Sequence, residues 1–146
     1  MNTILDEETA NHFIRRINTL QENTIPKWGK MSCAQMLAHC SGAFEESTHK
    51  LNLFSELKIR FLRRNTVIGN KPYPKNMKTA KRFTINEKKH FEVEKARLIK
   101  GIERVQALDV NYLLNKKHPI FGRITQQQWH TFFTKHLDHH LRQFGV

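Results

Sequence analysis

The sequence lacks any long apolar run, and nothing approaches the roughly 18 consecutive apolar residues that a membrane span requires. Its first residues are acidic and contain no apolar h-region, so we expect no secretory signal. Only two cysteines are present, Cys33 and Cys40. On one helix their Cα atoms would lie about 10.5 Å apart, which is too far for a disulfide. These absences together favour a cytoplasmic protein with reduced thiols and no membrane association.

Acidic residues are almost absent from one part of the chain. The segment 58–89, which we call the basic segment, holds eleven Lys and Arg residues and a single acid, Glu87. It carries +10 of the net charge of +12, and the rest of the chain is nearly balanced. Such a segment is often only a solvated surface. Alternatively, it borders a pocket and attracts an anionic substrate, or it binds nucleic acid by counterion release. We rank nucleic acid last, because few aromatics interleave and no recognition-helix or RNP pattern is present.

The chain has the length and apolar content of one domain spanning residues 1–146. It holds 146 residues, of which 38% are hydrophobic, enough for one packed core. Apolar residues recur at helical spacing in four stretches, and no strand pattern of useful length is present. The expected helices span 6–22, 32–48, 87–108 and 125–144, with a further short helix at 53–62 and a long loop at 66–84. Four main helices predict an all-α fold, packed as a four-helix bundle.

Three of these helices have a recognisable beginning. Ser32 is followed three residues later by Gln35, and Thr125 by Gln128, so a capping box is expected at the second and the last helix. Asn86 is the expected N-cap of the third main helix.

Histidine is frequent, with nine residues, and two of them fall on the apolar face of the last helix. At about 100° per residue, His136 and His140 lie about 40° apart, within the sector that carries Trp129, Phe133 and Leu137. Two imidazoles four residues apart can bind one metal ion. Alternatively, they are core histidines whose nitrogens form hydrogen bonds to other helices. The spacing alone leaves both interpretations open.

A third ligand must come from another helix, and His39 is the candidate, at the edge of the apolar face of the second helix. Taken by itself, this position is more typical of an ordinary histidine on the flank of a helix. His139, at the margin of the last helix's apolar face, and Glu46 are expected to face solvent, with a supporting contact to the site as the alternative for each. Cys33 and Cys40 are expected to be packing residues rather than nucleophiles. The remaining histidines are expected at the surface or at helix ends: His12, His49, His90, His118 and His130.

Two stretches of the sequence resemble the DinB-like (DinB/YfiT) superfamily. They are KMSCAQMLAHCSGAFE, which contains His39, and HPIFGRITQQQWHTFFTKHLDHHLRQFG, which contains His136 and His140. Within the superfamily, the HP-x-FG run and the HLDHHLRQFG ending are similar to an uncharacterised subgroup known as a domain of unknown function. The resemblance covers nearly the whole chain and is most specific at residues 30–44 and 118–145.

The resemblance implies an up-down-down-up four-helix bundle with a long connection, here basic, between its second and third helices. It also implies a divalent metal held by His39, His136 and His140, which agrees with the helical-face argument. Zn²⁺ is the first choice for three imidazole nitrogens, followed by Ni²⁺ and Fe²⁺. DinB-like relatives often pair, so a homodimer is also implied, although the sequence offers no patch for it.

Three histidine ligands leave an open coordination position, which is typical of catalytic sites. We therefore expect a metal-dependent enzyme in which the ion activates water or a low-molecular-weight thiol, as in a hydrolase or a thiol transferase. Some relatives are transferases that use thiols such as bacillithiol, or mycothiol-dependent isomerases. The sequence assigns no catalytic side chain, and it indicates only a small, anionic substrate. The alternatives are a non-catalytic module that binds nucleic acid or another anion through the basic segment, and a structural or degenerate metal site.

Overall fold

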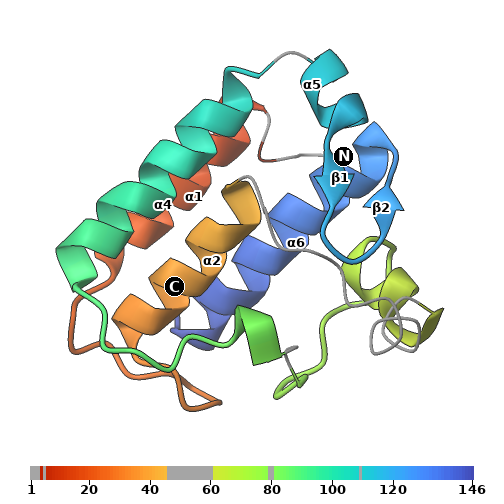
Figure 1. The fold of residues 1–146 in the computed structure, drawn as a ribbon. Coiled ribbons are helices and arrows are strands. Elements are labelled where there is room, and N and C mark those ends of the chain that lie inside the picture. Colours follow the sequence, from red (N-terminus) through yellow and green to blue (C-terminus); the bar gives the residue numbers. More distant parts are fainter. Residues whose placement is uncertain (1–3, 5, 46–60, 79–80, 109) are drawn as a thin grey trace.

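The structure, a computed structural model, describes residues 4, 6–45, 61–78, 81–108 and 110–146. It is mostly helical, which confirms the all-α prediction at that level (Figure 1). No helix in these ranges is both long and apolar enough to cross a membrane. The long helices are α1 (Glu7–Thr19), α2 (Cys33–Phe44), α4 (Phe91–Gln106) and α6 (Gln126–Gln143). The shorter elements are the helical residues 61–67, η1 (Lys81–Phe83), α5 (Val110–Asn115), β1 (Lys117–His118) and β2 (Gly122–Arg123).

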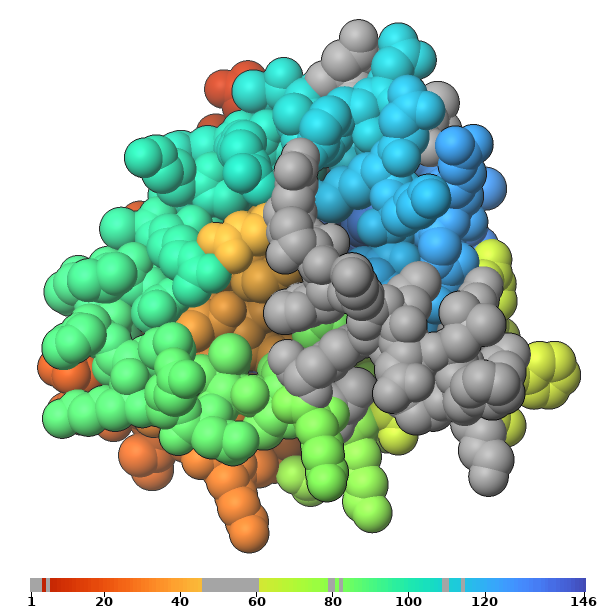
Figure 2. All heavy atoms as spheres, viewed as in Figure 1, coloured from red at the N-terminus to blue at the C-terminus, as the bar shows by residue number. Residues whose placement is uncertain are grey.

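The long helices bury the apolar faces that their periodicity predicts. On α6, Trp129, Phe133 and Leu137 are almost completely buried, because their four-residue spacing puts them on one side of the helix. Helix α2 packs against both α4 and α6, and α1 packs against the same two helices. On the face seen in Figure 2, only a strip of α2 shows beside α4. On α4, Gly101 permits close contact, since a Cβ there would lie 3.0 Å from Cβ of Phe44.

The predicted capping boxes are both present. The Ser32 hydroxyl accepts from the Gln35 main-chain N–H, and the Gln35 side chain accepts in return from the Ser32 N–H. Thr125 and Gln128 form the same pair at the start of α6. These bonds satisfy main-chain N–H groups that the first helical turn leaves without partners. They fix the starting points of the two helices that carry His39, His136 and His140.

Helix α2 ends earlier than predicted, at Phe44 rather than near residue 48. Arg104 of α4 donates to the Phe44 carbonyl oxygen at 2.6 Å, and Lys116 donates to the Glu45 carbonyl oxygen at 3.3 Å. These cations satisfy carbonyl groups that further helical turns would otherwise satisfy. The short-range sequence pattern could not show this end, since both donors come from distant parts of the chain.

The predicted start of the third main helix is wrong. Helix α4 begins at Phe91 with His90 as N-cap, not at residue 87 with Asn86 as N-cap. The Gln35 side-chain amide donates to the Glu87 carbonyl oxygen at 3.1 Å, which ties this chain to the start of α2. Residues 88–90 therefore run without helical structure before Phe91 is buried in the core.

Within its described residues, 66–78 and 81–84, the predicted loop is present except at its two ends. Residues 66 and 67 still belong to a helix, and η1 lies near the far end. Of the predicted short helix at 53–62, residues 53–60 lie outside the described residues, and 61–62 are helical. Between the third and fourth main helices, where the sequence predicts no helix or strand, the structure contains α5 and the antiparallel pair β1–β2. With two residues a strand, this pair is too short to give a periodic signal.

Candidate metal centre

The three histidines that the sequence singled out lie together in the fold. His136 and His140 are one turn apart on α6, and His39 reaches them from α2. One ring nitrogen from each lies within 4.8 Å of the other two, and Nε2 of His136 is 3.0 Å from Nε2 of His39. The three ring centroids are 4.8 to 4.9 Å apart. The group therefore has the composition and spacing to hold a metal ion.

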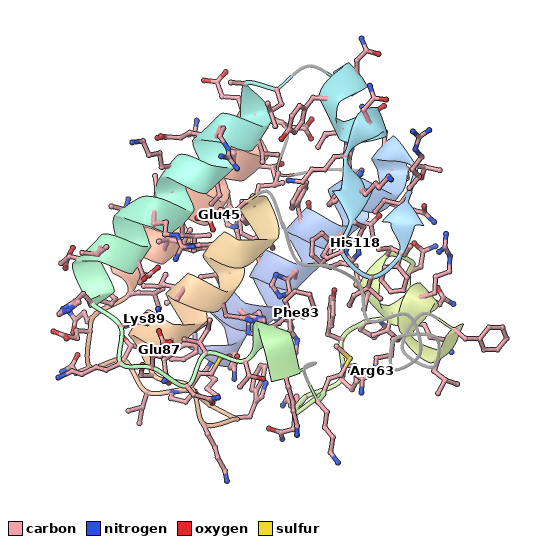
Figure 3. The ribbon with its side chains drawn as sticks, in the orientation of Figure 1. Glu45, Arg63, Phe83, Glu87, Lys89 and His118 are labelled. Carbon is pink, nitrogen blue, oxygen red and sulfur yellow. The ribbon has the colours of Figure 1, made fainter. Side chains whose placement is uncertain are left out.

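A main-chain carbonyl orients His39. Its Nδ1 lies 3.0 Å from the carbonyl oxygen of Phe83, which belongs to η1 (Figure 3). A carbonyl oxygen only accepts, so Nδ1 must carry the proton and donate it. The lone pair of this neutral ring is then on Nε2, the atom that faces His136. The chain between α2 and α4 thus determines which nitrogen of His39 can bind a metal.

A side-chain amide orients His140 in the same way. Nδ1 of His140 lies 2.8 Å from Oε1 of Gln143, one turn further along α6. Nε2 of Gln143 donates to the Trp28 carbonyl oxygen at 2.7 Å, which fixes which end of the amide faces the histidine. His140 therefore donates from Nδ1, and its Nε2 holds the lone pair. Gly29 leaves room for this amide: it has φ +83°, and a Cβ there would lie 2.6 Å from Nε2 of Gln143.

His136 completes the group from the middle of α6. Because Nε2 of His39 holds a lone pair, Nε2 of His136 is the donor in the 3.0 Å contact between them when no metal is bound. Binding of an ion at Nε2 of His136 would require the other neutral tautomer, with the proton on Nδ1. Nδ1 of His136 is buried, and no described residue forms a hydrogen bond with it. The Phe132 ring stacks on the imidazole, with centroids 5.5 Å apart and planes 18° apart. The ring is therefore confined by packing and by its contact with His39.

Burial keeps all three imidazoles neutral. The pKa of His140 falls to about 3, mainly because burial desolvates the ring and secondly because His39 is close, while the Gln143 hydrogen bond opposes the shift. The pKa of His136 is well below its ordinary value because of burial and the adjacent His140 and His39. Burial also lowers the pKa of His39, against the opposing effect of the Phe83 carbonyl. The neutral ring is the form that binds metals.

This donor set fits a divalent ion. An ion about 2.0–2.1 Å from each imidazole nitrogen holds two of them roughly 3 Å apart, close to the separation between His39 and His136. Metal-binding histidines usually donate their other ring N–H to a carbonyl or carboxylate, which orients the ring. Here the Phe83 carbonyl and the Gln143 amide do so for two of the three rings. Sequence reasoning missed both partners, although Gln143 stands at the i+3 position from His140.

The prediction that His118 lies at the surface is wrong, since its exposed fraction is 2%. Its Nδ1 accepts from the main-chain N–H groups of Ile120 and Phe121 at 3.1 and 3.3 Å. The ring thereby closes the turn between β1 and β2 (Figure 3). Gly122, with φ +69°, takes the left-handed conformation at the end of this turn. The HP-x-FG run is thus explained by the geometry of this turn. A histidine and proline followed closely by a turn glycine is the signal that could have indicated it.

The other histidines differ in their exposure to solvent. His12 and His90 are exposed as predicted, and His130 is half-buried. His139 is also half-buried rather than solvent-facing, because its ring lies between those of Trp28 and Tyr73 at 5.7 and 5.4 Å. The predictions for His49 and Glu46 concern positions outside the described residues.

The two cysteines are buried, free thiols, as predicted. Burial raises the pKa of Cys33 to about 11 and that of Cys40 further still. Because the thiolate is the reactive form, neither sulfur is suited to act as a nucleophile at neutral pH. Their place in the packed face of α2 confirms their role as core residues.

A protein-family model matches nearly the whole chain. The model of a family described as a protein of unknown function (DUF1569) matches residues 2–145. No curated protein and no solved structure matches the sequence. The matched range includes all three histidines of the candidate metal centre and the β1–β2 turn. Because the match covers nearly the whole sequence, the chain belongs to the DUF1569 family.

Proposed function

We propose that α1, α2, α4 and α6 form a DinB-like four-helix bundle of up-down-down-up order. The pairwise packing supports this, since α2 and α1 each contact both α4 and α6. The long connection expected between the second and third bundle helices corresponds to the chain between α2 and α4, which contains the basic segment. In this arrangement His39, His136 and His140 project from two neighbouring helices of the bundle, as the DinB-like resemblance implies.

We also propose that the protein is a cytoplasmic, metal-dependent enzyme whose ligands are His39, His136 and His140. The observation that carries the proposal is the convergence of three neutral imidazoles, two of them oriented by acceptors at Nδ1. A divalent ion, with Zn²⁺ ahead of Ni²⁺ and Fe²⁺, supplies Lewis-acid chemistry that makes a nucleophile of water or a thiol near neutral pH. Three protein ligands leave room for a substrate atom.

The chain's own residues would prepare the site for this chemistry. The Phe83 carbonyl and the Gln143 amide hold the two Nδ1 protons, so that no proton has to leave those rings before they bind a metal. The rings of Phe132 and Tyr73 pack beside His136 and limit the access of water. We propose hydrolysis or thiol transfer with a small anionic substrate, with a low-molecular-weight thiol as cofactor in the second case.

Elemental analysis tests the metal site. Protein purified without an affinity tag or chelator should contain about one divalent metal ion per chain, and the His136→Ala variant should contain almost none. His90→Ala is the matched control, because His90 is exposed at the start of α4 and should not change the metal content. Absence of metal from the wild-type protein, or equal metal in wild type and His136→Ala, would refute the site.

Activity is tested separately on metal-loaded protein. Transfer of a thiol to a chromogenic electrophile and hydrolysis of a chromogenic ester should each be measured beside the His136→Ala variant. We expect one of the two rates to exceed that of the variant by at least about 100-fold. Rates equal to the variant's in both assays would leave a metal site without the proposed catalysis.

A further inference from the structure

A pocket of about 520 Å³ lies next to the metal centre. Its lining residues come from the chain before α2, from the long loop, and from the last turns of α6 with the residues after them: 27, 28, 72, 73, 75, 135, 138, 139, 142, 145 and 146. None of the three proposed metal ligands is among them. The His139 ring forms part of the wall, with its centroid 5.4 Å from that of Tyr73 and 5.1 Å from that of His140. We call this cavity the lateral pocket. Its size is within the range of small-molecule sites.

Cations dominate the charged groups of the lateral pocket. Lys27, Lys75 and Arg142 line it together with Lys135, whose ammonium already donates to three carbonyl oxygens. Among the lining residues, Asp138 has the one carboxylate side chain. It lies 2.8 Å from Arg16, which is outside the lining, and 3.7 Å from Arg142, at the outer limit of ion-pair distance. No acid among the described residues lies within ion-pair distance of Lys27 or Lys75.

The pocket also has an apolar wall. The rings of Trp28 and Tyr73 line it, and both residues are half-buried. The Lys75 ammonium lies 4.9 Å from the centroid of the Trp28 ring, so a cation and an aromatic face are presented at the same place. Such a combination suits a ligand that has both a negative group and a planar or apolar body.

We propose that the lateral pocket binds a small organic oxyanion, with a carboxylate or phosphate group on a planar, apolar body. The ammonium of Lys75 and the guanidinium of Arg142 would meet the oxyanion through charge-assisted hydrogen bonds. Trp28 and Tyr73 would contact its body. The main chain at Trp28 also accepts from Gln143, which in turn orients His140, so the bound anion would lie beside the metal centre without needing a metal ion itself.

Calorimetric titration of the metal-free, full-length protein with phenyl phosphate tests the proposal. Phenyl phosphate should bind saturably, more tightly than inorganic phosphate, which lacks the aromatic body, and at least about tenfold more tightly than phenol, which lacks the charge. The double variant Lys75→Gln/Arg142→Gln should weaken binding by at least about tenfold. Lys100→Gln on α4 removes an exposed cation elsewhere and should leave the Kd within about twofold.

Three results would overturn the proposal. Equal affinity for phenol and phenyl phosphate would show that the pocket binds only the aromatic ring and does not recognise the phosphate. Unchanged affinity in the double variant would show that the oxyanion binds elsewhere. Loss of binding in His136→Ala and in chelator-treated protein, with recovery on addition of Zn²⁺, would place the anion on the metal ion. The proposal does not depend on catalysis, because binding to metal-free protein is measured even if the metal assay fails.

Discussion

The chemistry of the three-histidine group depends on which nitrogen of each ring carries the proton. In His39 and His140 that choice is made by acceptors at Nδ1, one a main-chain carbonyl and the other a glutamine amide held in turn by Trp28. If these acceptors were removed, each ring could rotate or exchange tautomers, and a metal would have to reorder it on binding. The acceptors should therefore contribute to metal affinity without touching the ion.

Gln143→Met tests this at a single residue. Methionine keeps much of the side-chain volume but removes the oxygen that accepts from His140, so we expect Zn²⁺ affinity to fall by about 10- to 100-fold. Gln127→Met, at an exposed position on the same helix, is the control and should leave affinity unchanged. Competition with a chromogenic chelator measures both. Equal affinities in the two variants would mean that the amide does not orient the metal-binding ring.

The lowered pKa values predict how the metal-free protein responds to acid. At pH 5 folded His140, with a pKa of about 3, is neutral, whereas in the unfolded chain its pKa returns to about 6.5 and it is protonated. The unfolded state then binds more protons, so the free energy of unfolding falls as the pH falls from 7 to 5. His140 alone should account for about 2 kcal/mol of this loss. Urea unfolding of the metal-free protein at both pH values measures it.

The His140→Gln variant provides the comparison. Glutamine does not titrate, so the variant should lose less stability between pH 7 and pH 5 than the wild type does. If both proteins lose the same free energy, His140 is not held neutral by its surroundings in the folded state.

Much of the candidate site could be predicted at the residue scale, because helical periodicity places His136 and His140 on one buried face of α6. The position of His39 on the flank of α2 was also visible, and the structure brings its ring to the other two. The Phe83 carbonyl could not be predicted, since its position depends on the path of an irregular segment. The burial of His118 was missed because a closed two-residue turn leaves no periodic signal.

At the scale of elements, the helix middles were predictable and their ends were not. The helical spacing of apolar residues involves only residues a few positions apart in the sequence. The same holds for the capping boxes at Ser32 and Thr125. The end of α2 and the start of α4, by contrast, depend on Arg104 and Gln35, which contact main-chain groups 60 and 52 residues away in sequence. A short-range pattern contains no information about such partners.

One side chain attaches the start of the long loop to α6. The Lys135 ammonium donates to the carbonyl oxygens of Thr66, Gly69 and Lys71 at 2.8, 2.5 and 2.5 Å, and its burial lowers the pKa of its amino group. These hydrogen bonds satisfy main-chain carbonyl groups at and just after the C-terminal end of the helical residues 61–67. They also hold the chain that carries Tyr73 beside His136 and His139.

Lys135→Met should therefore loosen this loop without unfolding the protein. Methionine cannot donate, so the three carbonyl oxygens would turn to water and the segment 66–73 would open more often. Hydrogen exchange followed by mass spectrometry should show at least about tenfold faster exchange in peptides that cover 66–73, and unchanged exchange in α4. Lys100→Met is the control for loss of a lysine. Uniform acceleration across all helices would instead indicate general destabilisation.

At the scale of the whole molecule, the charge imbalance is explained in part by contacts of the basic segment. Arg63 donates to the Lys78 carbonyl oxygen, Arg64 lies over the Phe121 ring, and Lys75 lies over the Trp28 ring. Among the described residues, these cations thus attach the segment to the helical body as well as giving it charge. Composition indicated the charge, but only the fold shows that Lys75 and Arg142 line one pocket.

The candidate metal centre connects two helices that are distant in sequence, so an ion there should stabilise the entire fold. His39 belongs to α2 and the other two ligands to α6, and the unfolded chain does not bring them together. A ligand that binds only the folded state stabilises it by about 2.7 kcal/mol when its free concentration is 100 times Kd. For a domain of this size, that corresponds to a rise in Tm of roughly 10 °C.

Thermal unfolding of chelator-treated protein, with and without added Zn²⁺, measures this rise. The His39→Ala variant removes the only proposed ligand on α2, so its Tm should respond to Zn²⁺ by no more than about a fifth of the wild-type shift. His12→Ala, which removes an exposed histidine from α1, should respond as the wild type does. An equal rise in His39→Ala would show that α6 binds the ion alone, and the metal would then not join the two helices.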